Sequence, residues 1–261
     1  MDNEFLDACK FGQTKKVEYI LRKKLVLPSI HNNLAIILAS EYGHDEIVKL
    51  LLQNPQVNHM DCDGAALLYA CRYNHVGVIK VLLSNSKVHP YFDYDRCICE
   101  ACLNGCSDVV KLLLQNKQFD PSCQDNKPIC LAIEYGHLKV VELLIKDPRV
   151  DPSDRDDYSI RIACTHGYFD IVKLLLQDPR VDLTNFAIRV ACTNNYADIV
   201  KMLLNLSHVD PSINKNYCIN TACENEYIEI VKLLLQDPRV DASNANSKNL
   251  EIKKMLEIWK R

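Results

Sequence analysis

One alanine returns at a nearly constant interval along the whole chain. Successive copies are 31 residues apart, except for one interval of 28. The alanines are Ala8, Ala39, Ala70, Ala101, Ala132, Ala163, Ala191 and Ala222. A fixed period of this size indicates stacked structural units, each too small to bury an apolar core alone. The sequence therefore predicts a repeat architecture in place of one or two conventional domains.

Each unit carries the pattern of two helices joined by a tight reversal. The first helix has small residues around the alanine, and the second has apolar residues at intervals of three and four, as at 47–52 and 230–235. A glycine occupies the reversal in five units, where a left-handed residue is expected: Gly12, Gly43, Gly105, Gly136 and Gly167. Proline ends several second helices, for example at Asp147-Pro148. An extended finger is predicted to lead from there to the next unit.

Residues 127–137, with the sequence KPICLAIEYGH, resemble the ankyrin repeat, whose hallmarks are a Thr-Pro-Leu-His start, paired alanines, Gly-His at the reversal and a Leu-rich second helix. The resemblance covers nearly the whole chain. It implies a helical solenoid that binds proteins. This chain departs from the family pattern in its missing starting His and its shorter period. The phrase LLQDPRVD, within 174–182 and 233–241, also resembles the multicopy ankyrin repeat families of large amoebal DNA viruses, which implies a viral protein that engages a host protein.

These patterns predict an all-α solenoid of about eight ankyrin-like helix-turn-helix repeats in one domain spanning 1–261. The expected repeats are 1–29, 30–60, 61–91, 92–122, 123–153, 154–184, 185–212 and 213–243. Residues 244–261 are predicted to form a capping helix that seals the stack with Ile252, Met255, Leu256 and Trp259.

The net charge of −3 gives no general attraction to phosphate backbones, so nucleic acid is not an expected partner. Lysines along the second helices, such as Lys49 and Lys111, have acidic residues three or four positions away, which favours pairing within each helix. The acidic start and the lack of an apolar run long enough to cross a bilayer predict neither a secretory signal nor a membrane span. We therefore expect an intracellular, cytoplasmic protein, monomeric and with reduced cysteines.

The chain contains thirteen cysteines, whose role has two possible interpretations. Six follow the repeating alanine, and equivalent positions on packed helices, about 8–10 Å apart, are too far apart for disulfides. They are interpreted as small buried apolar residues. A denser cluster, Cys97, Cys99, Cys102 and Cys106, supplies the alternative function of a metal- or redox-responsive protein. Only three of these cysteines share one helix face, and a structural zinc site would need a fourth ligand from Cys123 or Cys130, so no cofactor is predicted.

No catalytic triad, phosphate-binding glycine loop or carboxylate pair stands out, which favours a non-enzymatic protein. In ankyrin proteins, partners usually contact the finger tips and two variable residues after the alanine pair, on the concave face. Carried over by position, and with Tyr and Arg as frequent interface anchors, this rule selects a set of expected partner-binding residues. The variable positions give Tyr42, Arg72, Tyr73 and Tyr135, and the aromatic finger expected at 91–96 gives Tyr91, Phe92, Tyr94 and Arg96.

Overall fold

The computed structural model describes residues 1–85, 93–181 and 185–260, with the backbone alone at Asp156. The regular structure in these residues is helical throughout and includes no strand, so the predicted all-α fold is confirmed. The chain divides into two compact units, unit 1 of residues 1–150 and unit 2 of residues 151–261. None of the described helices has the length and hydropathy needed to cross a bilayer.

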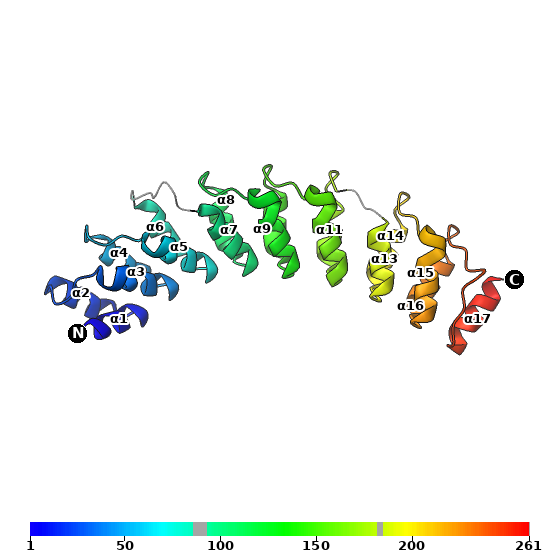
Figure 1. Ribbon diagram of the computed structural model, residues 1–261, viewed down its shortest axis with the longest axis horizontal. Helices are drawn as coiled ribbons and strands as arrows, with labels where there is room; N and C mark the ends of the chain where they lie inside the picture. Colours follow the sequence, from blue (N-terminus) through cyan, green and yellow to red (C-terminus); the bar gives the residue numbers. More distant parts are fainter. Residues whose placement is uncertain (86–92, 182–184, 261) are drawn as a thin grey trace. The chain divides into compact units, whose positions relative to one another are not determined.

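Helices alternate in short pairs, as the repeat pattern predicts (Figure 1). The first helices of the repeats are α1 (Asp2–Lys10), α3 (Ile30–Glu41), α5 (Asp61–Arg72), α7 (Tyr94–Leu103), α9 (Cys123–Glu134), α11 (Asp154–His166), α13 (Phe186–Thr193) and α15 (Ile213–Glu224). The second helices are α2 (Thr14–Arg22), α4 (Asp45–Leu52), α6 (Val76–Ser84), α8 (Ser107–Leu114), α10 (Leu138–Ile145), α12 (Phe169–Leu175), α14 (Ala197–Leu204) and α16 (Ile228–Leu235). The repeat boundaries within this order stay a prediction.

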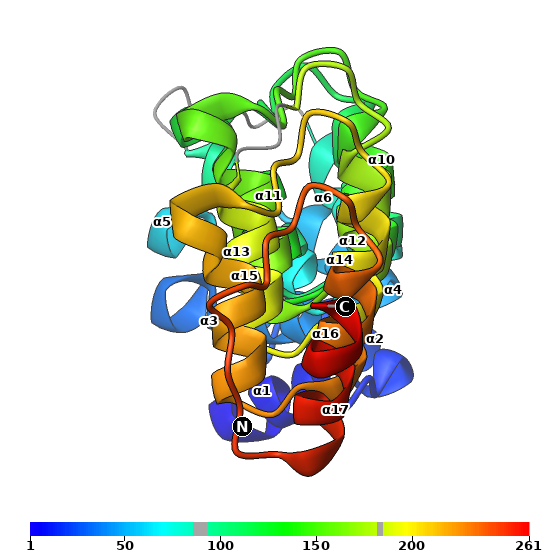
Figure 2. The same ribbon diagram turned by 90° about the vertical axis from the view of Figure 1, so that its right-hand side faces the viewer.

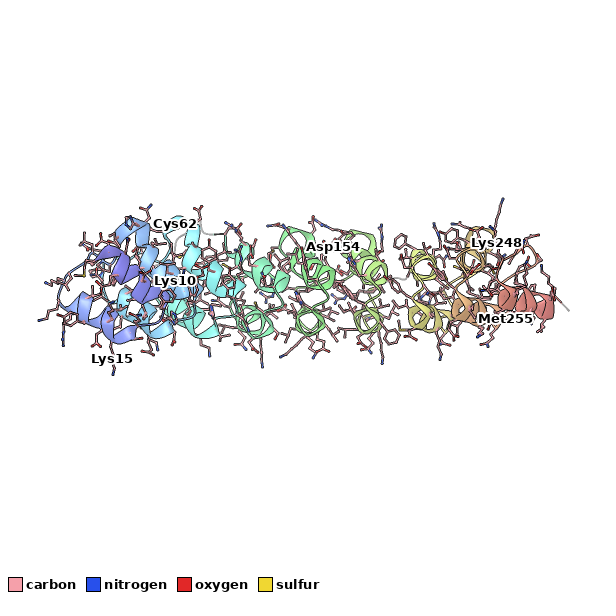
Figure 3. All side chains as sticks on the ribbon, turned by 90° about the horizontal axis from the view of Figure 1, so that it is seen from below. Lys10, Lys15, Cys62, Asp154, Lys248 and Met255 are labelled. Carbon is pink, nitrogen blue, oxygen red and sulfur yellow. The ribbon has the colours of Figure 1, made fainter. Side chains whose placement is uncertain are left out.

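The helices of each unit form two layers, one of first helices and one of second helices (Figure 2). In unit 1, α1, α3, α5, α7 and α9 pack in sequence order, and α2, α4, α6, α8 and α10 do the same. The repeating alanines, among them Ala39 and Ala101, are fully buried, because a small side chain lets neighbouring first helices approach closely. In unit 1, Lys15 of α2 and Cys62 of α5 reach opposite sides of the ribbon (Figure 3).

The reversal between the two helices of a repeat uses one residue with positive φ. Glycine takes this position in the five repeats where it was predicted, for example Gly43 at φ 79°. Asn74, Asn195 and Glu226 take it elsewhere, at φ 63°, 61° and 60°. Glu226 shows that the position tolerates a residue with no particular preference for the left-handed region.

A ladder of hydrogen bonds, here called the reversal ladder, links successive reversals. In unit 1, the Nε2 atoms of His44, His75 and His137 each bond a backbone carbonyl of the preceding repeat at 2.9 Å. The carbonyls belong to Lys10, Glu41 and Leu103. Other residues take the place of histidine in three repeats. Cys106 Sγ donates to Arg72 O at 3.3 Å, the Tyr196 hydroxyl to Thr165 O at 3.4 Å, and the Tyr227 hydroxyl to Thr193 O at 3.4 Å. The loop-packing role that the family resemblance implies for the histidines is confirmed.

The ladder also explains why glycine suits the reversal. A Cβ atom at Gly43 would lie 2.6 Å from Nδ1 of His75, and one at Gly105 would lie 2.6 Å from Nδ1 of His137. Glycine is therefore favoured at the reversal for two reasons: the residue has positive φ, and the next repeat leaves no room for a Cβ atom.

The segments between repeats contain hydrogen-bonded turns, such as the one closed by the Val57 N–H bond to Asn54 O at 3.1 Å, so the predicted finger is not extended throughout. In several repeats the chain enters the first helix through consecutive left-handed residues: 31–33, 62–64, 124–126 and 214–216. Asparagine and aspartate are common there, because they tolerate this region better than most residues. The side chains of Asn33 and Asn216 then accept the backbone N–H groups of Asn58 and Asp241, at 3.0 and 2.9 Å. These bonds join the entry turns of neighbouring repeats.

The Asp-Pro-Arg phrase forms a brace between repeats. Asp237 accepts two bonds from the guanidinium of Arg239, at 2.9 and 2.6 Å. The free edge of the guanidinium bonds Val209 O at 2.7 Å and Leu204 O at 2.9 Å, both in the preceding repeat. In unit 1, Arg149 repeats the arrangement with Asp147, Phe119 O and Leu114 O. The phrase thus ends one helix and ties it to the repeat before.

The predicted cap is helix α17 (Leu250–Trp259), which packs on α16. Ile252 and Leu256 are buried, and Met255 and Trp259 are half-buried, as their common stripe predicts. The side chain of Asn249 caps the helix by accepting the N–H groups of residues 251 and 252.

Candidate partner-binding surface

Exposed aromatic rings recur where the first helices of unit 1 end. Phe11, Tyr42, Tyr73 and Tyr135 are 62%, 44%, 48% and 55% exposed, and each follows the last residue of its helix directly. We call these four residues the aromatic strip. Because reversal-ladder carbonyls lie one position before Phe11, Tyr42 and Tyr73, the ladder fixes the backbone that carries these rings.

The N-terminal part of the strip is joined by a lysine. Lys10 Nζ lies 5.5 Å from the ring centroid of Phe11 and 5.3 Å from that of Tyr42. These distances allow a cation–π interaction with both rings. Aromatic faces of two adjacent repeats therefore meet around one positive charge.

The middle of the strip contains an ion pair between repeats. Arg72 Nε and Nη2 donate to the two carboxylate oxygens of Glu100 at 3.0 and 2.9 Å. Its guanidinium carbon also lies 5.4 Å from the ring centroid of Tyr69, which stacks on Tyr73. Glu100 raises the pKa of the Arg72 guanidinium above its ordinary value. Arg72 thus holds α5 to α7 and supports Tyr73.

The last ring of the strip, Tyr135, stacks on the ladder residue His137 with centroids 6.4 Å apart and planes 14° apart. Tyr73 approaches His75 in the same position, also at 6.4 Å. Each tyrosine therefore lies against the histidine of its own repeat, with the Tyr73 ring tilted by 43° to that of His75. The rest of the ring is open to solvent.

Two predicted anchors have a different setting from the one we expected. Tyr94 and Arg96 belong to the first turn of α7, where Asp93 caps the helix by accepting the Arg96 N–H, so their placement in a finger was wrong. Tyr94 is half-buried and packs edge-on against Phe119, with centroids 5.3 Å apart. Burial raises the pKa of its hydroxyl. Arg96 is exposed. The predicted anchors Tyr91 and Phe92 lie outside the described residues.

The cysteine cluster does not act as one group. Cys97 contacts Cys71 of the preceding repeat, while Cys99 contacts Cys123 of the following one. Cys102 is fully buried, and Cys106 occupies a rung of the reversal ladder. Within residues 1–85, 93–181 and 185–260 there is no group of three or more His, Cys, Asp or Glu side chains that could hold a metal ion.

The lysines of the second helices pair less than predicted. Lys49 bonds Asp45 and Glu46 of its own helix, at 3.4 and 2.6 Å. Lys232 instead bonds Glu251 of the cap at 3.4 Å. In the part of the chain that the structure describes, pairing with the lysine's own second helix occurs at Lys49 alone among these lysines. The lysines mostly extend into solvent.

Phe11 and Lys10 are site residues that the predicted set omitted. They occupy the two variable positions of the first repeat, so the repeat register itself supplied the signal. Their contact with Tyr42 depends on packing between repeats, which the register does not specify.

Comparison with known proteins identifies the repeat. A family model described as ankyrin repeats in three copies matches residues 5–93, 86–156 and 160–249. No curated protein matches the sequence. Among the similar solved structures is the crystal structure of the human ASB11 ankyrin repeat domain, at 17% sequence identity and a TM-score of 0.58. The match covers 71% of this chain and 90% of that domain, and at this identity it supports the fold alone.

Proposed function

Because the chain belongs to the ankyrin repeat family, whose members generally mediate protein–protein interactions, we propose that it is a non-catalytic scaffold that binds a partner protein through the aromatic strip of unit 1. The observation that carries this proposal is the recurrence of an exposed ring at one position in four of the first five repeats. Tyrosine is enriched among interface anchors because it offers a large apolar face with few rotatable bonds.

The strip is restricted to unit 1. The corresponding positions of unit 2 hold His166, Asn194 and Asn225, and the fourth repeat of unit 1 holds Asn104. The resemblance to ankyrin proteins supports the concave face as the location of the strip. Arg72 would add hydrogen-bond donors beside the rings, and the exposed Arg96 would add donors at the other end of a first helix. The ladder and the Arg72–Glu100 pair hold the surface in place before binding, which reduces the ordering entropy that opposes association.

The setting of this interaction is part of the same proposal. The net charge of −3 supports a protein partner over nucleic acid or an anionic membrane, and the sequence patterns support a monomer in the cytoplasm. The LLQDPRVD phrase supports a viral protein that binds a host protein. The structure gives that phrase a role in stability as well, through the Arg239 brace.

A triple variant, Tyr42→Ala/Tyr73→Ala/Tyr135→Ala, tests the strip. The matched control is Tyr19→Ala, since Tyr19 lies on the second helix α2 and is also half exposed. Each variant is used to capture proteins from a lysate, with quantitative mass spectrometry, after circular dichroism and thermal unfolding have shown that it folds.

At about 1 kcal/mol or more for each anchor, the triple variant should bind a specific partner at least about 100-fold more weakly. The control should bind as the unmodified chain does. Equal capture by the triple variant and the unmodified chain would refute the strip as the binding surface. A large loss of thermal stability in the triple variant would show that the rings stabilise the fold.

A further inference from the structure

Cys99 and Cys123 form a thiol pair between adjacent repeats of unit 1. Cys99 lies in α7 and Cys123 is the first residue of α9, two helices that pack together. Their Sγ atoms are 4.0 Å apart, about twice the length of a disulfide bond. The side chains are 9% and 5% exposed, so the pair lies just beneath the surface.

Two other thiol pairs provide an internal comparison. Cys71 contacts Cys97, and Cys192 contacts Cys218. All four of these side chains are fully buried. Burial raises the pKa of Cys71, and hydrogen bonding to Cys218 together with burial raises that of Cys192. Cys71 and Cys192 therefore stay protonated near neutral pH, and burial keeps all four thiols out of reach of solutes.

The electrostatic setting of Cys99 is the opposite. The hydrogen bond with Cys123 lowers the pKa of Cys99, and the positive charge of Lys127 adds to this effect. Burial and the negative charges of Asp95 and Asp93 oppose it. The same contact, together with burial, raises the pKa of Cys123. Of the two thiols, Cys99 therefore loses its proton more readily. A thiolate is the reactive form of cysteine.

We propose that Cys99 and Cys123 form a reactive dithiol site that takes small-molecule disulfides, such as glutathione disulfide, as substrate and closes into a disulfide joining α7 to α9. The site is separate from the aromatic strip and its chemistry does not depend on a protein partner. It also differs from the sequence-based alternative of a Cys97–Cys106 cluster, because the second thiol comes from the next repeat.

The reaction proceeds by two thiol–disulfide exchanges. The Cys99 thiolate attacks one sulfur of glutathione disulfide, whose sulfur–sulfur bond breaks and releases one glutathione thiolate. Cys99 then carries a mixed disulfide and no charge, so the hydrogen bond that raised the pKa of Cys123 is lost. Cys123 gives its proton to solvent, and its thiolate attacks Sγ of Cys99 and expels the second glutathione thiolate. Two protein thiols lose two electrons, and glutathione disulfide gains them.

The test uses the full chain with Cys62→Ser, which removes the exposed thiol as a competitor. The protein is incubated with glutathione disulfide, and the remaining thiols are alkylated at successive times. Peptide mass spectrometry then follows each cysteine pair in the same sample. We expect the Cys99–Cys123 disulfide to form at least tenfold faster than a disulfide at either buried pair. Equal rates at all three pairs, or no Cys99–Cys123 disulfide, would overturn the proposal.

Two further variants in that background test the order of attack. Cys123→Ser should accumulate a glutathione adduct on Cys99, whereas Cys99→Ser should accumulate none on Cys123. Cys106→Ser is the control, because a hydroxyl can replace this thiol as donor to Arg72 O and should leave the reaction unchanged. An adduct that appears first on Cys123 would reverse the assigned roles and refute the mechanism. Circular dichroism of each variant confirms folding, and the pair-resolved rates of the parent protein decide the proposal if a variant does not fold.

Discussion

Replacement of Arg239 by alanine tests the brace that ties unit 2 together near its C-terminal end. The side chain donates to Val209 O at 2.7 Å and to Leu204 O at 2.9 Å, while Asp237 holds the guanidinium in place. A hydrogen bond from a charged donor contributes about 1.5–3 kcal/mol where it is well buried. The Arg239 side chain is one-third exposed, so we take about 1 kcal/mol for each carbonyl. Arg239→Ala should therefore lower the free energy of unfolding by about 2 kcal/mol.

The single tryptophan of the chain, Trp259, provides the readout. It is half-buried in the capping helix α17, so its fluorescence follows unfolding of the C-terminal repeats. With a urea dependence of about 1–3 kcal/mol/M, the expected loss moves the midpoint down by about 1 M. Circular dichroism of the same samples reports the loss of helix.

Two controls separate the brace from a general effect of lost charge. Arg239→Lys keeps the charge but lacks the planar fork, so it should recover less than half of the lost stability. Arg149→Ala removes the same kind of brace in unit 1 and should affect the Trp259 transition less, because stabilisation in a repeat array acts mainly between neighbours. A midpoint for Arg239→Ala within about 0.2 M of the parent would refute the assigned contribution, since the smallest expected shift is several times larger. If Arg239→Lys were as stable as the parent protein, the positive charge alone would account for the stabilisation and the planar guanidinium would not be required.

Two other predictions concern the reversal and the pH dependence of the brace. Gly43→Ala should lower the free energy of unfolding by about 2 kcal/mol or more, since it places a side chain at φ 79° and a Cβ atom 2.6 Å from the ring of His75. Urea unfolding measures this loss. The control Gly77→Ala, in helix α6, should be neutral or stabilising because its Cβ would meet only ordinary contacts. Arg239 lowers the pKa of Asp237, so this carboxylate contributes stability that is complete above the ordinary aspartate pKa of 3.8 and is lost as the pH falls through its lower folded value. Asp237→Asn should thus destabilise the chain at pH 6 and make progressively less difference in acid, as urea midpoints across that range would show; a difference independent of pH would contradict the assignment.

The periodic parts of the sequence specified the parts of the fold that depend on local pattern. Apolar spacing predicted the second helices, the glycines predicted the reversals, and the stripe of Ile252 and Leu256 predicted the cap. Exposure of Tyr42, Tyr73 and Tyr135 followed from their register within the repeat. Their role in binding stays a prediction.

The missed features depend on contacts between positions that are not equivalent. The argument against disulfides compared cysteines one repeat apart, whereas Cys99 and Cys123 are offset from that register and so approach to 4.0 Å. The brace was missed because Asp-Pro was interpreted only as a helix stop, and the reach of the following arginine was not considered. The start of α7 carried an available signal, since Asp93 stands three residues before Arg96 in the position of a helix cap.

The reversal ladder and the arginine brace share one property: their bonds between repeats end on backbone carbonyl oxygens. A carbonyl is present at every residue, whatever its side chain. A duplicated repeat therefore brings its own donors and finds acceptors in whichever repeat precedes it, with no matching substitution required in the neighbour. Gene duplication and deletion can change the number of repeats in such a chain while leaving each new junction bonded, and the exposed residues of each copy remain free to diverge.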